Sequence, residues 1–219
     1  SLVTLRADLA DLQAQGQLIR THGGAVRVPR AEVPYAQRAA AHASQKAAIG
    51  ATAARLVRDG EVILLDCGST TLQVALHLAL RPEVTIITND LPIGMELCRR
   101  HHPQSILLGG ALSTPHLCVV GPETERALAG LRVDRLFLAT DGVSEGRLME
   151  RSPLTVSAKQ AMIHAANEVV LVADSSKFGQ AGVSAVCELP VVHRVITDEG
   201  LPEDWRALLA EGLTLVTSE

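Results

Sequence analysis

Short apolar runs alternate with segments of helical pattern along most of the chain. The run Val62–Leu65 consists of branched apolar residues, and it is short enough to be a strand buried on both faces. Similar runs, most of them ending in small polar clusters, lie at 84–88, 105–108, 133–140, 168–173, 193–197 and Leu213–Val216. Alternating helices and apolar strands predict an α/β fold, in which a mostly parallel sheet carries helices on both faces.

One helix is predicted before the first of these strands and one after it. One spans residues 72–80, after a polar turn, and the other is the alanine-rich segment 44–58. Ser44 is the expected N-cap of the alanine-rich helix, and Gly60 lies beyond its expected end.

The first 28 residues follow a different pattern. The spacing of Leu5, Leu9 and Leu12 predicts a helix over residues 1–15. A strand, a glycine turn and a second strand are predicted at 18–21, 22–24 and 25–28. A helix with small outward residues and a basic hairpin resemble the recognition helix and wing of a winged helix-turn-helix. The alternative is that both elements only pack against the rest of the domain.

Pro29 and Pro34 bracket a polar stretch that can continue neither a strand nor a helix. We therefore predict three parts: residues 1–28, a linker at 29–43 and an α/β domain at 44–219.

Composition and charge narrow the function classes. Residues 1–38 hold five arginines and three acids, a net charge of +2, whereas the whole chain has a net charge of −4. This asymmetry permits an N-terminal part that faces nucleic acid. With only four aromatic residues in 219, stacking platforms for single-stranded nucleic acid are not expected. No apolar run is long enough to cross a bilayer and no signal peptide opens the chain, so we expect a cytoplasmic protein with no membrane partner.

Cysteine and histidine spacing predicts neither a disulfide nor a metal site. The four cysteines form no C-x-x-C pair and are expected to be buried free thiols. The eight histidines show no metal-binding spacing, and no cofactor is expected.

The polar turn after the first strand is the best candidate for chemistry. Gly68, Ser69, Thr70 and Thr71 lead from a strand into a helix, where close backbone approach, free amides and hydroxyl donors suit a phosphate. The alternative is an ordinary connection with a polar N-cap. Neither the P-loop spacing nor G-x-G-x-x-G is present, so a nucleotide is not expected.

Polar groups at the ends of other strands are expected to converge on the same rim, because ligands lie beyond the carboxyl ends of parallel strands. Lys177 either neutralises the phosphate or is a surface lysine paired with Asp174. Asp141 and Gly142 either form a turn or bind ligand hydroxyls. The other members of this set are Asn89, Gly109 and Gly110.

Residues 142–146 match G-x-S-x-G, the motif of a hydrolase nucleophile. No helical pattern starts after Ser144, and only His164 and His193 are available as generic partners downstream. A serine nucleophile is therefore not expected.

In order along the chain, these residues resemble the DeoR family of bacterial transcriptional regulators. The resemblance is carried by Ser1 to Leu9 and Gln17 to Ala25, by Lys46, by Leu65 to Thr71, and by Thr88-Asn89, Leu108 to Gly110, Val120-Gly121, Asp141 to Val143 and Asp174 to Gly179. It covers essentially the whole chain.

The resemblance implies a C-terminal sensor domain similar to ribose-5-phosphate isomerase and glucosamine-6-phosphate deaminase, which binds a phosphorylated sugar or a related metabolite. It also implies an N-terminal domain that binds operator DNA, in a homo-oligomer that usually acts as a repressor. Asp66 joins the predicted ligand site through this resemblance. The predicted DNA contacts are Thr4, Arg6, Arg20 and His22.

Three departures from the family pattern qualify these expectations. The chain starts inside the DNA-binding domain, so residues 1–28 are expected to be a remnant that binds an operator poorly. Ala7 replaces an arginine of the recognition helix, and residues 147–157 fit the family loosely.

Two rival functions remain at this point. An active sugar-phosphate isomerase or deaminase would need a second carboxylate where Ser144 stands, which argues against proton transfer between carbons. A module that uses the α/β domain only for oligomerisation, with a vestigial ligand site, is the other.

Overall fold

The computed structural model describes residues 18–21, 24–27, 33–209 and 212–216, the first two ranges by their backbone alone. The chain divides into two units, Ser1–Glu32 and Val33–Glu219. In the first unit, β1 (Leu18–Thr21) and β2 (Gly24–Arg27) pair as antiparallel strands, which confirms the two predicted strands.

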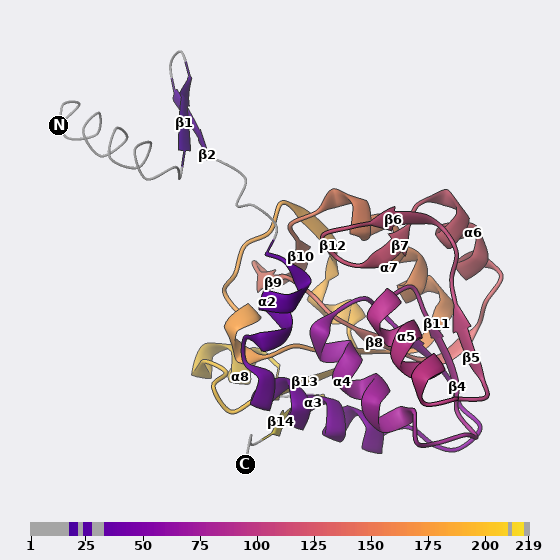
Figure 1. Cartoon of the computed structure of the whole chain (residues 1–219). Helices are drawn as coiled ribbons and strands as arrows, with labels where there is room; N and C mark the ends of the chain where they lie inside the picture. The colour runs from indigo at the N-terminus through magenta and orange to yellow at the C-terminus, as the bar shows by residue number, and fades with distance from the viewer. Residues whose placement is uncertain (1–17, 22–23, 28–32, 210–211, 217–219) are drawn as a thin grey trace. The chain divides into compact units, whose positions relative to one another are not determined.

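A fully parallel sheet of seven strands forms the centre of the second unit (Figure 1). The order of its strands across the sheet is β14-β13-β11-β8-β3-β4-β5. Their bounds are β3 Val62–Leu65, β4 Thr85–Thr88, β5 Ser105–Leu107, β8 Val133–Leu138, β11 Ala166–Val172, β13 Arg194–Asp198 and β14 Leu213–Val216. All seven apolar runs are strands, so the predicted α/β fold is confirmed.

Successive side chains along each strand point to opposite faces of the sheet, so the apolar core is divided into two clusters, one on each face. In β3, Leu64 packs into one apolar cluster while Ile63 and Leu65 pack into the other. Helices α3 (Ala43–Arg55), α4 (Ser69–Leu78) and α5 (Leu91–Arg99) cover the second face and lie together in Figure 1. Helices α6 (Pro122–Ala129) and α7 (Pro153–Ala165) cover the first, where the cluster also receives Trp205 of α8 (Glu203–Leu208).

Two small antiparallel sheets and one short helix complete the unit and were not predicted. The sheets are β6 (Ala111–Ser113) with β7 (Cys118–Val120), and β12-β10-β9, with bounds Ser184–Glu188, Arg147–Glu150 and Gly142–Ser144. Short 3-10 turns lie at η1 (Ser175–Lys177) and η2 (Leu189–Val191). The short helix is α2 (Tyr35–Ala40), which lies in the stretch expected to be a linker.

Several local expectations were wrong. Helix α3 begins at Ala43 with His42 at its N-cap, while Ser44 donates to its neighbour Gln45 instead of capping the helix. Helix α4 begins at Ser69, so the polar residues expected to precede the helix form its first turn. All four thiols are free, but Cys98 is exposed. Within the described ranges, no helix combines the length and apolar character needed to cross a membrane.

Candidate functional site

A pocket lies where the order of strands in the sheet reverses. From β3 the chain runs through β4 to β5 at one edge, and β8, on the other side of β3, starts the run to the opposite edge. Side chains that follow β3 and β8 therefore meet at a topological switch point, where ligands of open α/β sheets bind. The space in and above the pocket, counted together with open solvent at its mouth, is about 420 Å³.

The first turn of α4 forms one wall of the pocket. Gly68 precedes the helix, and its N–H donates to Asp90 Oδ2 at 3.1 Å. Helix geometry leaves the next three amides without an intrahelical acceptor. Ser69 and Thr70 line the pocket. These free donors and the positive end of the helix dipole form a surface suited to an anion.

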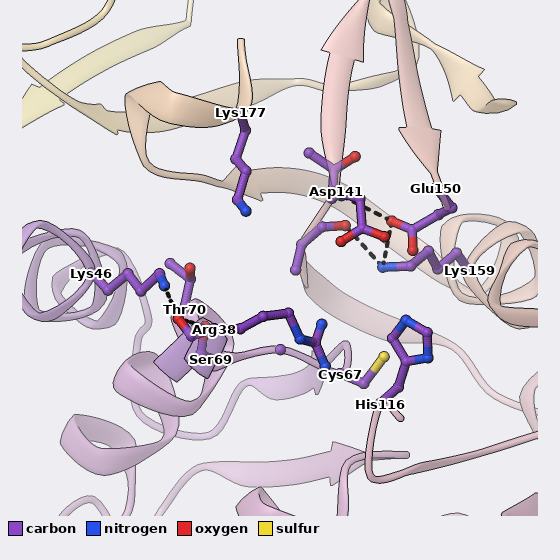
Figure 2. Close-up of a pocket in the computed structure, with 13 residues that line it drawn as sticks. Arg38, Lys46, Cys67, Ser69, Thr70, His116, Asp141, Glu150, Lys159 and Lys177 are labelled. Carbon is purple, nitrogen blue, oxygen red and sulfur yellow. Dashed lines mark hydrogen bonds and ion pairs between the residues drawn. The ribbon is translucent and has the colours of Figure 1, made fainter. Parts of the chain in front are cut away.

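The sequence contains three lysines, and all three line this pocket together with Arg38 (Figure 2). The Lys46 ammonium is buried and donates to the carbonyl oxygens of Arg38 and, at 2.6 Å, of Ala41. Burial lowers the pKa of Lys46; the nearby charges of Lys177 and Arg38 also lower it, whereas Asp174 raises it.

Among the described residues, none of Arg38, Lys46 and Lys177 forms an ion pair with a carboxylate. The expected alternative, Lys177 paired with Asp174, is not found among the described residues. Asp174 Oδ1 instead accepts from the backbone N–H and the hydroxyl of Ser176. Three cations without an ion-pair partner among the described residues thus line the pocket together with the first turn of α4.

Acidic groups gather at the other end of the pocket. The Lys159 ammonium is buried, pairs with Asp66, lies 3.4 Å from Glu150 Oε1 and donates to the Ala139 carbonyl oxygen at 2.9 Å. Burial raises the pKa of Glu150 to about 7; the Lys159 charge opposes this rise, and the Asp141 and Asp66 charges add to it.

His116, Asp141 and Glu150 each place a possible metal-ligand atom within 4.8 Å of the others. Imidazole and carboxylate donors suit Zn²⁺ or Mn²⁺. Sequence spacing did not predict this group, because its members come from the β6–β7 connection, the end of β8 and β10. The Lys159 ammonium lies next to this group, 3.4 Å from Glu150 Oε1, so one positive charge is already present there.

Five of the predicted ligand residues lie in the pocket wall: Gly68, Ser69, Thr70, Asp141 and Lys177. Two others lie behind it. Asp66 is fully buried and pairs with Lys159, and the Thr71 hydroxyl donates to the Gly68 carbonyl oxygen at 2.9 Å.

The remaining predicted ligand residues do not line the pocket and have structural roles. The Asn89 amide donates to the Val119 carbonyl oxygen at 2.9 Å, which holds β7 against the end of β4. The Gly109 carbonyl oxygen accepts from Thr124. Gly110 and Gly142 allow close approach, since an added Cβ would lie 2.2 Å from Thr124 Oγ1 and from the Gln180 carbonyl oxygen, respectively.

Sequence reasoning missed four charged residues and one histidine of the pocket: Arg38, Lys46, Glu150, Lys159 and His116. Two of them could have been recognised from their position in the sequence pattern of a helix. Lys46 lies on the buried stripe of α3 with Ile49, and Lys159 lies on that of α7 with Met162. A lysine on an apolar helical stripe needs a buried partner or a ligand.

The hydrolase interpretation is excluded by the fold, because Ser144 ends β9 and is followed by a hairpin turn to β10, not by a helix. The predicted DNA contacts Thr4, Arg6 and His22 lie outside the described residues. Arg20 lies in β1, where only the backbone is described.

Fold and pocket together define an α/β domain with a polar pocket at the switch point of its parallel sheet. The family model of the DeoR C-terminal sensor domain matches residues 41–199, and that of the DeoR-like helix-turn-helix domain matches residues 1–30. The chain therefore belongs to the DeoR family of transcriptional regulators.

Relatives include a repressor and an activator. The transcriptional repressor AccR of Agrobacterium fabrum is 37% identical over 91% of this chain and 79% of its own length. The L-fucose operon activator of Escherichia coli is 32% identical over 90% of this chain and 82% of its own.

A structural relative shows the fold alone. The eIF2B delta subunit of Chaetomium thermophilum aligns with a TM-score of 0.51 at 15% identity, over 70% of this chain and 55% of that one. Ribose 5-phosphate isomerase A of Methanocaldococcus jannaschii aligns with a TM-score of 0.44 at 23% identity, over 61% of this chain and 53% of that one.

Proposed function

We propose that the sensor domain binds a phosphorylated sugar or a closely related metabolite in this pocket, and that binding modulates attachment of the protein to operator DNA. The observation that carries the proposal is the group of three unpaired cations, Arg38, Lys46 and Lys177, facing the free amides of α4. A phosphate dianion would supply the missing negative charge and accept several of these donors. Asp141 and the hydroxyls of Ser69 and Thr70 would bond the sugar hydroxyls or the phosphate.

We infer the mode of regulation from the two domains that the family models match, a helix-turn-helix domain and a sensor domain. An effector weakens DNA binding only if it binds more tightly to the state that has lower affinity for DNA. We propose that the protein is a repressor released in this way, although the relatives include both a repressor and an activator.

Calorimetric titration with a panel of sugar phosphates tests the ligand. A charge-assisted hydrogen bond contributes about 1.5–3 kcal/mol, so Lys177→Ala and Lys46→Met should each weaken binding about 10- to 150-fold. Arg126→Ala removes one exposed positive charge outside the pocket lining and should leave affinity unchanged. Equal affinities in all four proteins would refute the proposed anion site.

Two further assays separate this function from its rivals. For a protein with a complete helix-turn-helix domain, a mobility shift with DNA from upstream of the encoding gene should weaken when the bound sugar phosphate is added. The same panel should show no aldose–ketose interconversion above background, since turnover would support the enzymatic alternative. A flat response across the whole panel would support the vestigial module.

We also propose that the protein is a homo-oligomer, as pairing of operator half-sites requires. An apolar groove between α5 and the edge strand β5 supports this, because Met95, Ile106 and Leu107 in its lining are exposed. Light scattering coupled to size-exclusion chromatography tests it; a strictly monomeric mass at micromolar concentration would contradict it.

A further inference from the structure

The parallel sheet has a free edge at β5, which is the last strand in its order. Figure 1 shows β5 at the side of the domain, and all three of its residues are exposed. Just after β5, the Leu108 N–H donates to the Thr88 carbonyl oxygen at 2.8 Å, toward β4. Because successive backbone groups of a strand point to opposite sides, the N–H and C=O groups of Ser105 and Leu107 face away from β4 and can accept another strand.

This edge lacks most of the features that prevent a strand from pairing with another chain. Such features are charged side chains, a proline within the strand, or an element that covers it. From His101 to Pro122 the sequence contains no lysine, arginine, aspartate or glutamate. The short length of β5 limits its pairing, but Ile106 and Leu107 are apolar and exposed on it. Exposed apolar surface of this kind marks a contact with another molecule.

An apolar hollow lies beside the edge, with a protruding side chain next to it. The hollow is formed between α5 and β5, and its lining includes Leu91, Leu97 and Leu107. Gly94 keeps α5 close to β5, since an added Cβ would lie 3.3 Å from Leu107 Cδ1. Met95 follows it on α5 and is largely exposed. The surface therefore presents both an apolar recess and an apolar side chain suited to such a recess.

Charges near the hollow have partners within the chain. Arg99 is the one charged residue in its lining. The Arg99 guanidinium pairs with Glu96 at 2.6 Å, and Arg100 pairs with the same carboxylate at 2.5 Å. The hollow therefore fits an apolar, uncharged occupant that also brings a free strand edge.

We propose that this occupant is a second copy of the chain, and that the two β5 strands pair antiparallel across a two-fold axis. The inference rests on the proposed homo-oligomer and names its interface. In such an isologous contact each copy offers the same surface, so Met95 of each copy can enter the hollow of the other. The two seven-stranded sheets would then continue into each other.

A large part of the area that a dimer contact needs is already apolar and exposed. Met95, Ile106 and Leu107 are 74%, 48% and 48% exposed. At ~180 Å² for a fully exposed side chain of this size they present ~300 Å² per copy, so a two-fold contact would bury ~600 Å² through these side chains alone. Stable interfaces begin at ~1,200 Å², and the backbone edge and the other residues around the hollow add to the contact.

Light scattering coupled to size-exclusion chromatography tests the surface with two variants and a control. Ile106→Lys and Met95→Lys each place a charge in the contact and should raise the dissociation constant of the dimer about tenfold or more. Leu80→Lys changes a leucine that is 71% exposed outside the lining of the hollow, and it should keep the mass of the wild type. Far-ultraviolet circular dichroism shows whether each variant is folded.

Hydrogen exchange tests the strand pairing itself. In the wild type, at a concentration where the dimer dominates, the outward amides of Ser105 and Leu107 should exchange at least about tenfold more slowly than in monomeric Ile106→Lys. Calorimetric titration with the sugar phosphate that the wild type binds should give the same affinity for Ile106→Lys, because Ile106 does not line the polar pocket.

Four outcomes are distinguishable besides the expected one. Unchanged masses in both lysine variants would overturn the inference and leave a homo-oligomer that forms through another surface. Dissociation of the variants without a difference in β5 exchange would overturn the strand pairing. A monomeric wild type with protected β5 amides would mean that a segment of the same chain covers the edge, and a monomeric wild type with unprotected amides would also reject the homo-oligomer. A flat response to all sugar phosphates would instead refute the proposed effector and leave this interface standing.

Discussion

Replacing Lys159 by methionine is expected to destabilise the sensor domain strongly. The Lys159 side chain is 3% exposed and the Asp66 side chain is 0% exposed, so their ion pair is shielded from water. The same ammonium donates to the Ala139 carbonyl oxygen at 2.9 Å and lies 3.4 Å from Glu150. Methionine retains most of the buried volume but offers none of these acceptors a proton.

The magnitude follows from the charge left behind. Removing one partner of a buried ion pair costs about 3–5 kcal/mol, because the other charge stays buried and uncompensated. A domain of ordinary stability has a free energy of unfolding of about 5–15 kcal/mol, so Lys159→Met should remove about a fifth of it or more. The double variant Lys159→Met/Asp66→Asn removes both charges and should recover at least about 1 kcal/mol.

Urea unfolding at pH 7, followed by far-ultraviolet circular dichroism, measures these differences. Arg126→Met is the control, since it removes one exposed charge from α6 and should change the free energy of unfolding by less than about 0.5 kcal/mol. The reasoning is refuted if Lys159→Met unfolds within about 1 kcal/mol of the wild type, or if the double variant is less stable than the single one.

Three further outcomes are expected. The pKa of Glu150 is raised from 4.5 to about 7, so its protonated form stabilises the fold at low pH. In urea titrations, the free energy of unfolding of the wild type, measured relative to that of Glu150→Gln, should therefore fall by about 3 kcal/mol from pH 4.5 to pH 8. A pH-independent difference would contradict this. Gly110→Ala should lower the melting temperature more than Gly60→Ala does. Both glycines have positive φ, but of the two only Gly110 has an atom 2.2 Å from the position of an added Cβ. Equal decreases in melting temperature would disprove the clash. Of the four thiols, exposed Cys98 should react first with an aromatic disulfide reagent; uniform rates would contradict the described burial.

The parallel sheet could be predicted because its central strands are buried on both faces. A run such as Val62–Leu65 needs no partner to be recognised, since every side chain in it is apolar. The strands β9, β10 and β12 could not be predicted in the same way. They are short, and β12 pairs with β10 across more than 30 residues of chain, so their existence depends on tertiary contacts.

The candidate site was predictable only in part, for a related reason. The position after a strand marks the correct rim of the sheet, which is why Ser69 and Lys177 were found. It does not say which way a side chain turns, and Asn89 turns to a backbone carbonyl oxygen of β7. Some residues of the pocket belong to helices, such as Lys46 and Lys159. A search limited to the residues that follow strands cannot identify them.

Helix α2 gives the pocket a physical connection to the start of the sensor domain. It begins at Tyr35, three residues after the first unit ends at Glu32, and it contributes Arg38 to the pocket wall. Lys46 holds the end of this helix by donating to the carbonyl oxygens of Arg38 and Ala41. An anion that attracts the Lys46 ammonium competes directly with those two carbonyl oxygens. Under the proposed function, the free energy of effector binding would therefore depend on the conformation of α2, and regulation requires such a difference in affinity between two states.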